Sequence, residues 1–180
     1  GESIQGEINQ TRDALTAVTQ KYHGLKSKYA TLKNISDRYD GYGNSIKKVM
    51  EQKSRDPGIH GVVADIIHVE KEYETAIEIA LGGSIQNIVT DTEETAKKMI
   101  EFLKKNRYGR ATFLPLTSIR GHSLKDSETL LKEEGVIGLA NTLVKTQEPY
   151  IPLMQFLLGR ILVVDHIDHA VKLAKKYKYS

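Results

Sequence analysis

The sequence contains no cysteine, and this single absence removes several kinds of chemistry. Without a thiol the chain can form no disulfide, offer no thiolate to a metal ion and use no cysteine nucleophile. It also has no apolar run near the length of about 18 residues that a bilayer span requires. Its first residues lack the basic and apolar pattern of a signal peptide. We therefore expect a cytoplasmic protein without membrane contact.

An excess of charge of either sign is also nearly missing. The chain has 26 basic and 23 acidic residues among 180, a net charge of +3. Any contact with nucleic acid must therefore depend on where the basic residues cluster and not on their total number. The hydrophobic fraction of 39% and the charged fraction of 27% are ordinary for a soluble protein of one domain with an appendage.

The first 40 residues have the pattern of a coiled coil. Positions separated by alternating steps of four and three form a heptad seam over five heptads, with mainly polar residues between them. The apolar seam residues are Ile4, Ile8, Leu15, Val18, Tyr22, Leu25, Tyr29, Leu32 and Tyr39, with Thr11 and Ser36 at the two polar positions. Such a helix would be about 54 Å long and would need another helix to cover its seam. That helix could belong to a second copy or to the same parent polypeptide.

Residues 58–116 alternate short apolar runs with amphipathic segments, which predicts strand, helix, strand, helix, strand. We expect strands at 62–69, 85–90 and 111–116. The first helix would bury a stripe that includes Ala76, Ile77 and Leu81 and would end at the glycine pair 82–83. Asp91 is the expected N-cap of the second helix, whose buried stripe would be Ala96, Met99, Ile100 and Leu103.

The remaining third of the chain is predicted in less detail. Residues 117–124 have the composition of a loop, and a short helix is expected around 129–131. Residues 135–144 are apolar but contain two glycines, so their form stays open. A helix at 149–158, a strand at 160–165 and a last helix follow. One face of the last helix would carry Ala170, Val171, Ala174 and Tyr177.

Two blocks within this pattern carry a family resemblance. They read YExAIExALGGxxQNIV at 73–89 and FLKxNxxGRATFLPL at 102–116. With these blocks the chain, from about residue 39 onward, resembles the hinge domain of SMC proteins, the structural maintenance of chromosomes ATPases, in its bacterial type. The resemblance implies a mixed α/β fold of two pseudo-symmetric subdomains preceded by a coiled-coil arm. It implies a hinge that dimerises with a second copy and contacts DNA without sequence preference, whereas ATP hydrolysis would belong to head domains outside this chain.

The sequence contains an internal echo that agrees with two subdomains. Leu81-Gly82, a strand, Asp91 and Ala96 are matched later by Leu158-Gly159, a strand, Asp165 and Ala170, with the same spacing of five from Asp to Ala. Any α/β unit can produce such an echo, which is the alternative interpretation. With the echo we expect an arm at 1–40, hinge subdomain I at 41–116, and a connector with an incomplete subdomain II at 117–180.

The second copy is expected to be incomplete at its carboxyl end. The first copy continues from its helix into the strand at 110–116, and no matching strand follows in the second. The resemblance implies that the family continues with strands, a glycine-rich segment at the dimer interface and the returning coil. We therefore expect a second polypeptide segment that carries this return half, and an unpaired sheet edge without it.

Six basic residues cluster within fourteen positions that contain only Glu101 as an acid. They are Lys97, Lys98, Lys104, Lys105, Arg107 and Arg110. Such a cluster suits contacts to phosphates, although lysines at the end of a helix also complement its dipole on a solvated face. Because the hinge resemblance implies DNA contact, we take these six as the candidate DNA-binding residues. A second cluster is Lys172, Lys175, Lys176 and Lys178.

No catalytic or metal site can be argued from the sequence. Asp165, His166, Asp168 and His169 are closely spaced, but Asp165 is already explained as a helix cap and no further ligands are evident. Gly82-Gly83-Ser84 lacks the lysine of a phosphate-binding loop. We expect no cofactor, metal or small-molecule substrate. Two other classes stay open: a small α/β enzyme tethered by a coiled coil, and a homodimeric coiled-coil adaptor.

Overall fold

The computed structural model describes residues 2–178, apart from the side chains of residues 2, 31 and 34–37. The chain divides into two compact units, Gly1–Gly43 and Asn44–Ser180, which are described separately. The first unit consists mainly of helix α1 (Glu2–Arg38). Its apolar seam residues from Ile4 to Leu32 are 38–68% exposed, as expected of a coiled-coil strand without its partner.

The seam prediction is wrong at its last residue. Helix α1 ends at Arg38, so Tyr39 lies outside it. The Tyr39 side chain is only 3% exposed, and its ring meets the Tyr42 ring edge to face at 5.4 Å. Tyr39 is therefore a buried residue of the turn and not an exposed coil position.

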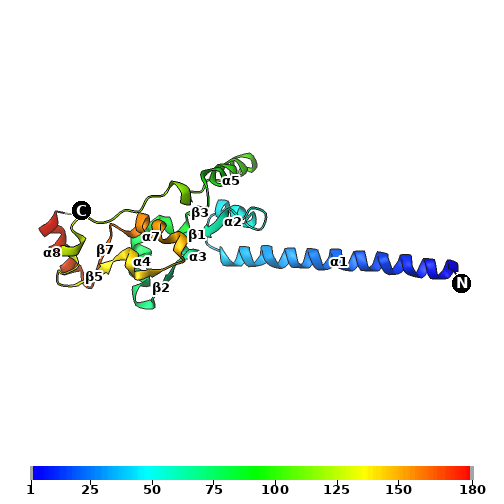
Figure 1. Cartoon of the computed structure of the whole chain (residues 1–180), viewed down its shortest axis with the longest axis horizontal. Coiled ribbons are helices and arrows are strands. Elements are labelled where there is room, and N and C mark those ends of the chain that lie inside the picture. The colour runs from blue at the N-terminus through cyan, green and yellow to red at the C-terminus, as the bar shows by residue number, and fades with distance from the viewer. Residues whose placement is uncertain (1, 179–180) are drawn as a thin grey trace. The chain divides into compact units, whose positions relative to one another are not determined.

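The second unit alternates helices and short strands (Figure 1). Its helices are α2 (Asn44–Glu51), α3 (Val63–Ile66), α4 (Glu74–Leu81), α5 (Glu93–Asn106), α6 (Ser127–Leu130), α7 (Ile151–Leu158) and α8 (Ile167–Tyr177). Its strands are β1 (Ile59–Val62), β2 (His68–Val69), β3 (Ile88–Thr90), β4 (Phe113–Pro115), β5 (Val136–Leu139), β6 (Val144–Lys145) and β7 (Leu162–Val164). Short 3₁₀ turns precede α4 and α7.

The strands form three small sheets. The first has the order β1-β3-β4, in which β1 is antiparallel and β4 parallel to β3. The second pairs β2 with β6, and the third pairs β5 with β7, both antiparallel. Parallel and antiparallel pairs occur together with helices between the strands, so the predicted mixed α/β class is confirmed.

The internal echo extends through the strands that precede it. In the first copy Ile59 pairs with Thr90, and in the second Val136 pairs with Val164. Both ladders contain a register irregularity directly after this pair. The strand β3 then leads into α5 as β7 leads into α8. The two copies therefore share a bulged hairpin-like pair, a helix between its strands and a helix after it.

One hydrophobic core joins the two copies. It includes Ile77 and Leu81 of α4 together with Leu153 and Leu158 of α7, all at most 5% exposed. The antiparallel pair β2–β6 also links one copy to the other. Each side chain of this kind stabilises the fold by about 1.5–3 kcal/mol when fully buried. Neither copy keeps its core when the other is removed, because each supplies part of it.

The strand expected at 62–69 is replaced by β1, the single turn α3 and the short β2. Gly61 has φ +137, a conformation that permits the bend before this turn. The Asp65 carboxylate accepts a hydrogen bond from the Val62 backbone N–H at 3.4 Å, and Val63 N–H donates to the Asn87 carbonyl. The apolar residues are buried as predicted, but by a turn and not by one extended strand.

Two details of the predicted helices α5 and α8 are also wrong. Thr92 and His166 are the N-caps, each one residue after the predicted aspartate. Ile100, expected in the buried stripe of α5, is 50% exposed. In α8 the buried residue is Leu173, whereas Val171 is exposed. The expected end of α4 at Gly82 is confirmed, with φ +53.

Candidate nucleic-acid interface

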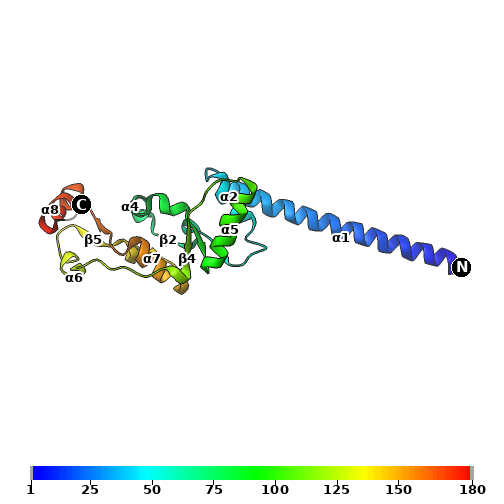
Figure 2. The ribbon, with the colours of Figure 1, turned by 90° about the horizontal axis from the view of Figure 1, so that it is seen from above.

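Helix α5 fixes the position of most of the candidate DNA-binding residues. Its buried residues are Thr95, Ala96, Met99 and Leu103. Glu93 and Glu94 lie in its first turn and Lys104 and Lys105 in its last, an arrangement that suits the helix dipole. Helix α2 packs beside α5 in the two views of Figures 1 and 2. The outward face of α5 is therefore held on a packed base.

All six predicted DNA-binding side chains are exposed, but they are not equivalent. Lys98 Nζ lies 2.9 Å from Asp56 Oδ2, and the Asp56 side chain is mostly buried. This ion pair partly balances the Lys98 charge. Lys97 lies on the same helix, and no ion pair of Lys97 is found among the described residues.

The basic residues at the end of α5 lie on a backbone that is held in place. Arg107 is the C-cap in the left-handed conformation, with φ 56, and Tyr108 N–H donates to the Leu103 carbonyl at 3.0 Å. Ser45 Oγ at the start of α2 donates to the Arg110 carbonyl at 2.6 Å. No local pattern indicates this role of Ser45, because the two residues are 65 positions apart.

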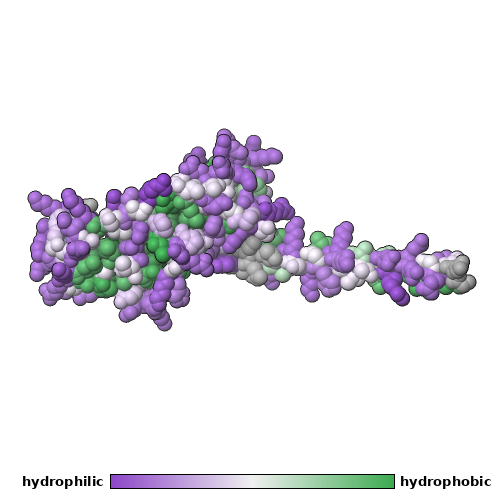
Figure 3. All heavy atoms as spheres, in the orientation of Figure 1, coloured by the Kyte–Doolittle hydropathy of each residue, from purple (hydrophilic) through white to green (hydrophobic). Residues whose placement is uncertain are grey.

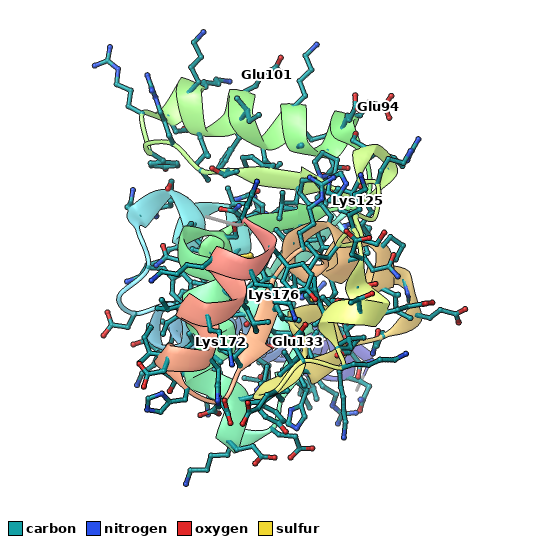
Figure 4. The ribbon with its side chains drawn as sticks, turned by 90° about the vertical axis from the view of Figure 1, so that its left-hand side faces the viewer. Glu94, Glu101, Lys125, Glu133, Lys172 and Lys176 are labelled. Atoms are coloured by element: carbon teal, nitrogen blue, oxygen red, sulfur yellow. The ribbon has the colours of Figure 1, made fainter. Side chains whose placement is uncertain are left out.

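A groove of about 610 Å³ lies at this end of α5. It is lined by Ile100, Leu103, Lys104, Arg107, Gly109, Arg110 and Ala111. Three cationic residues therefore border an apolar floor, and no acidic side chain lines the groove. Figure 4 shows Glu94 at the opposite end of α5, with Glu101 farther along the helix. An anion placed here would relieve the repulsion between like charges.

The second basic cluster is less available than the first. Lys176 Nζ lies 2.6 Å from Glu133 Oε1, and the same oxygen accepts a hydrogen bond from the Tyr177 hydroxyl at 2.7 Å. These bonds lower the pKa of Glu133, with the bond from Lys176 the largest cause. Lys178 is the left-handed C-cap of α8. Lys172 and Lys175 are exposed.

The four residues considered for a metal site serve other purposes in the structure. His166 Nδ1 accepts a hydrogen bond from Asp168 N–H at 3.1 Å, and His169 Nδ1 donates to Asp165 Oδ1 at 2.6 Å. Within residues 2–178 no group of three or more ligand side chains is arranged to hold a metal ion. Over the same residues, no helix combines the length and apolar character of a bilayer span.

Comparison with known proteins agrees with this architecture. The family model of the SMC proteins flexible hinge domain matches residues 56–174. The chain is 39% identical over 176 residues to the chromosome partition protein Smc of Bacillus subtilis, covering 97% of this chain and 15% of that protein. It is 34% identical over 178 residues to the protein of the same name from Clostridium kluyveri, with 96% and 15% covered. The chain thus spans about 15% of the length of these relatives.

Solved structures show the same fold. An asymmetric dimer of the Geobacillus stearothermophilus SMC hinge domain matches with a TM-score of 0.76 and 35% identity, over 98% of this chain and 71% of that chain. The Pyrococcus furiosus SMC hinge domain matches with a TM-score of 0.61 and 30% identity, over 80% and 75%. The fold and the sequence blocks define a chromosome-organising hinge module. The chain belongs to the SMC flexible hinge domain family.

Proposed function

We propose that this chain is a non-catalytic hinge module of an SMC-type ATPase that organises and segregates the chromosome, in the cytoplasm on the nucleoid. Membership in the hinge family supports the general role. The observation that carries the DNA contact is the basic groove at the end of α5, where Lys104, Arg107 and Arg110 converge without an acidic side chain in its lining. Phosphates are the anions that such a site would meet on DNA.

The DNA contact would involve the backbone and would not read sequence. Lysine and arginine side chains on a helix end position a duplex through its phosphates. Lys97, Lys105 and the groove cations can act together because they lie on one helix and the segment after it. Lys98 contributes less, because its Nζ is already paired with Asp56.

Charge reversal tests this assignment. Lys104→Glu combined with Lys105→Glu should weaken DNA binding and reduce the slope of log affinity against log salt by about one unit for each phosphate that is no longer bound. Lys71→Glu with Lys132→Glu is the matched control, since both residues are exposed lysines outside the cluster. Fluorescence anisotropy across salt concentrations measures both pairs. Equal slopes for the two double variants would remove these lysines from the interface.

We also propose that the hinge associates with a second copy. The Geobacillus stearothermophilus hinge is described as an asymmetric dimer, and this chain exposes apolar side chains that a partner could cover. Figure 3 shows such side chains gathered over the region of β5, β7 and α4, where Ile137 and Ile79 are exposed. Sedimentation equilibrium should find a dimer. A monomer at all micromolar concentrations would contradict the proposal.

The open edge of β7 suggests where a further segment joins. In the first copy β3 has neighbours on both edges, whereas β7 pairs only with β5 among the described strands. Beside β7 lies a cavity of about 350 Å³, whose lining includes Leu130, Leu162 and Leu173. We propose that a strand parallel to β7, from the same polypeptide or another, fills it as β4 pairs with β3.

A peptide experiment tests the strand. A peptide that spans the strands and coil following this segment in the parent polypeptide should raise the melting temperature of the chain and convert aggregates to a defined complex. A scrambled peptide of the same composition is the control. Indifference of a monodisperse, cooperatively folded chain to the peptide would show that the second copy closes without a strand.

The exposed seam of α1 is proposed to pair with an antiparallel helix from the same parent polypeptide. Eight apolar seam residues from Ile4 to Leu32 are exposed and need cover. The alternative is a parallel homodimer, as in a coiled-coil adaptor. A disulfide formed between two copies through an introduced Leu15→Cys would favour the homodimer and contradict the antiparallel arm.

A further inference from the structure

Helix α8 is anchored by few apolar side chains. Among its described residues only Leu173 is buried, whereas α5 buries four residues in the equivalent place. Ala170, Leu173 and Ala174 face a cavity and not a filled core. The free energy that holds α8 on the rest of the fold must therefore depend strongly on polar contacts.

Two polar contacts connect α8 to the segment Glu133–Gly135, which precedes β5. At the end of the helix, Glu133 accepts hydrogen bonds from Lys176 Nζ at 2.6 Å and from the Tyr177 hydroxyl at 2.7 Å. Figure 4 shows Glu133 and Lys176 close together on neighbouring elements. The Glu133 side chain is only 23% exposed, so this contact is partly shielded from water.

The other contact lies at the first turn of α8. His169 Nδ1 donates to Asp165 Oδ1 at 2.6 Å, and its Nε2 faces Glu134 Oε1 at 3.9 Å. The ring lies directly against the backbone of Gly135, where a Cβ would overlap both the imidazole and the Asp165 carboxylate. Gly135 has φ +81 and its carbonyl accepts a hydrogen bond from Asp165 N–H at 2.8 Å. The imidazole therefore sits between two carboxylates on a glycine platform.

The first copy has the same arrangement with one chemical difference. Asp91 N–H donates to the Gly58 carbonyl, and the Asp91 carboxylate accepts from Thr95 Oγ1 at 2.6 Å, four residues on. A Cβ at Gly58 would lie 2.6 Å from both of these oxygen atoms. Thr95 holds the position that His169 holds in the second copy. A hydroxyl that does not titrate near neutral pH is thus replaced by an imidazole that does.

We propose that residues 133–135 and α8 form a pH-sensitive latch, closed while the His169 imidazole is charged and loosened when it becomes neutral. The charged ring donates to Asp165 and presents a second N–H toward Glu134. The neutral ring keeps its proton on Nδ1 for Asp165, so its Nε2 lone pair faces the Glu134 carboxylate and repels it. The Glu133 contact keeps its charges through the same pH range and holds the far end of the helix.

The other charged groups around His169 determine the direction of the switch. The hydrogen bond to Asp165 is the largest cause that raises the pKa of His169, and the charges of Asp165 and Glu134 add to it. Burial and the charge of Lys172 act in the opposite direction. His166 lies 6.4 Å away, ring to ring, and Asp168 is paired with it. Both carboxylates nearest the ring therefore favour its charged form.

The sign of the pH dependence follows from this shift. Because the folded pKa of His169 is raised, its stabilisation is complete below the unfolded value of about 6.5 and is lost as the pH rises through the folded pKa. The pKa of Asp165 is lowered by the same hydrogen bond, so this carboxylate stays ionised throughout the range. The latch is therefore tightest in mildly acidic solution and loosens toward alkaline pH.

Hydrogen exchange of the α8 amides tests the latch, after correction for the intrinsic pH dependence of exchange. Between about pH 6 and about pH 8.5 the α8 protection factors should fall several-fold, whereas those of α5 stay constant. His169→Thr copies the first sequence repeat and should remove the difference between the two pH values. His68→Gln, which replaces an exposed histidine on β2, should retain it. Constant α8 protection in the wild type, or an unchanged fall in His169→Thr, would overturn the proposal.

A second variant separates the pH response from simple loosening. Glu133→Gln removes the charge that Lys176 pairs with, so it should lower α8 protection by a similar factor at both pH values. Protection of α5 in every variant shows that the domain remains folded. If Glu133→Gln abolished the pH dependence while His169→Thr kept it, the switch would belong to Glu133 and not to His169.

Discussion

The two internal repeats differ less in sequence than in what surrounds them. Both have a glycine before the first strand, a bulged strand pair, and an aspartate whose carboxylate bonds the residue four positions later. Yet β3 lies between two strands and α5 buries four side chains, whereas β7 has one neighbour among the described strands and α8 buries one side chain. The same local pattern thus produces a filled core in one copy and an open one in the other.

The largest expected effect comes from removing the central apolar side chain of each final helix. Met99→Ala in α5 should lower the free energy of unfolding by about 2–5 kcal/mol, because its surroundings are filled. Leu173→Ala in α8 should cost about half as much, since Leu173 already borders a cavity and packs against fewer neighbouring atoms. Urea denaturation measures both. Equal losses of stability would show that the two helices are packed equally well.

Adding volume should reveal the opposite asymmetry. Ala96 in α5 is 5% exposed, so Ala96→Leu would force its neighbours apart and destabilise by about 1–3 kcal/mol. Ala170 holds the equivalent position in α8 but lines the cavity, so Ala170→Leu should be neutral or stabilising by less than about 1 kcal/mol. Thermal unfolding of the two variants measures the difference. A strong destabilisation in Ala170→Leu would mean that the cavity is not available to side chains.

The helix caps offer a smaller contrast. Thr92 accepts a hydrogen bond from Thr95 N–H at 3.3 Å, and Thr92→Ala should cost about 1 kcal/mol. His166 caps α8 through its ring nitrogen, which an alanine would also remove. Because α8 contributes less to global stability, His166→Ala should shift the denaturant midpoint less than Thr92→Ala. The reverse order would indicate that α8 is part of the main cooperative unit.

The smallest expected difference concerns acid. The pKa of Asp91 is lowered, first by the hydrogen bond from Thr95. This group therefore contributes stability above its unfolded pKa of about 3.9, and the contribution is lost as the pH falls through the lower folded value. Asp91→Asn should flatten the dependence of the melting temperature on pH between about pH 5 and about pH 3. In the second copy, Asp165→Asn should lower the pKa of His169, which proton NMR of the imidazole would detect.

Much of the architecture follows from local pattern. The heptad spacing predicts α1 through Leu32, and the stripe of Ile77 and Leu81 predicts α4 with its glycine end. The capping region and the stripe of Met99 and Leu103 likewise predict α5. These segments are long relative to their period, so neighbours in sequence determine which face is buried. The exposed state of the six basic residues follows largely from the same helix.

The errors lie where distant residues decide. The turn inside 62–69 depends on Asn87 across the sheet, and the buried state of Tyr39 depends on a chain segment that is no longer helical. An apolar run alone does not distinguish a strand from a turn with equal burial. The partners of Lys98 and Arg110 lie 42 and 65 positions away, so no local pattern could identify them.

The sequence by itself therefore determined the coiled-coil seam, the alternation of helices and strands, the basic cluster and the family blocks, because each depends on residues a few positions apart. Tertiary structure alone decided that Lys98 is paired with an acid, which strand keeps an open edge, and that His169 lies between two carboxylates against Gly135. These properties depend on distances between segments far apart in the chain. Burial and electrostatic interaction vary with those distances, and a sequence pattern does not contain them.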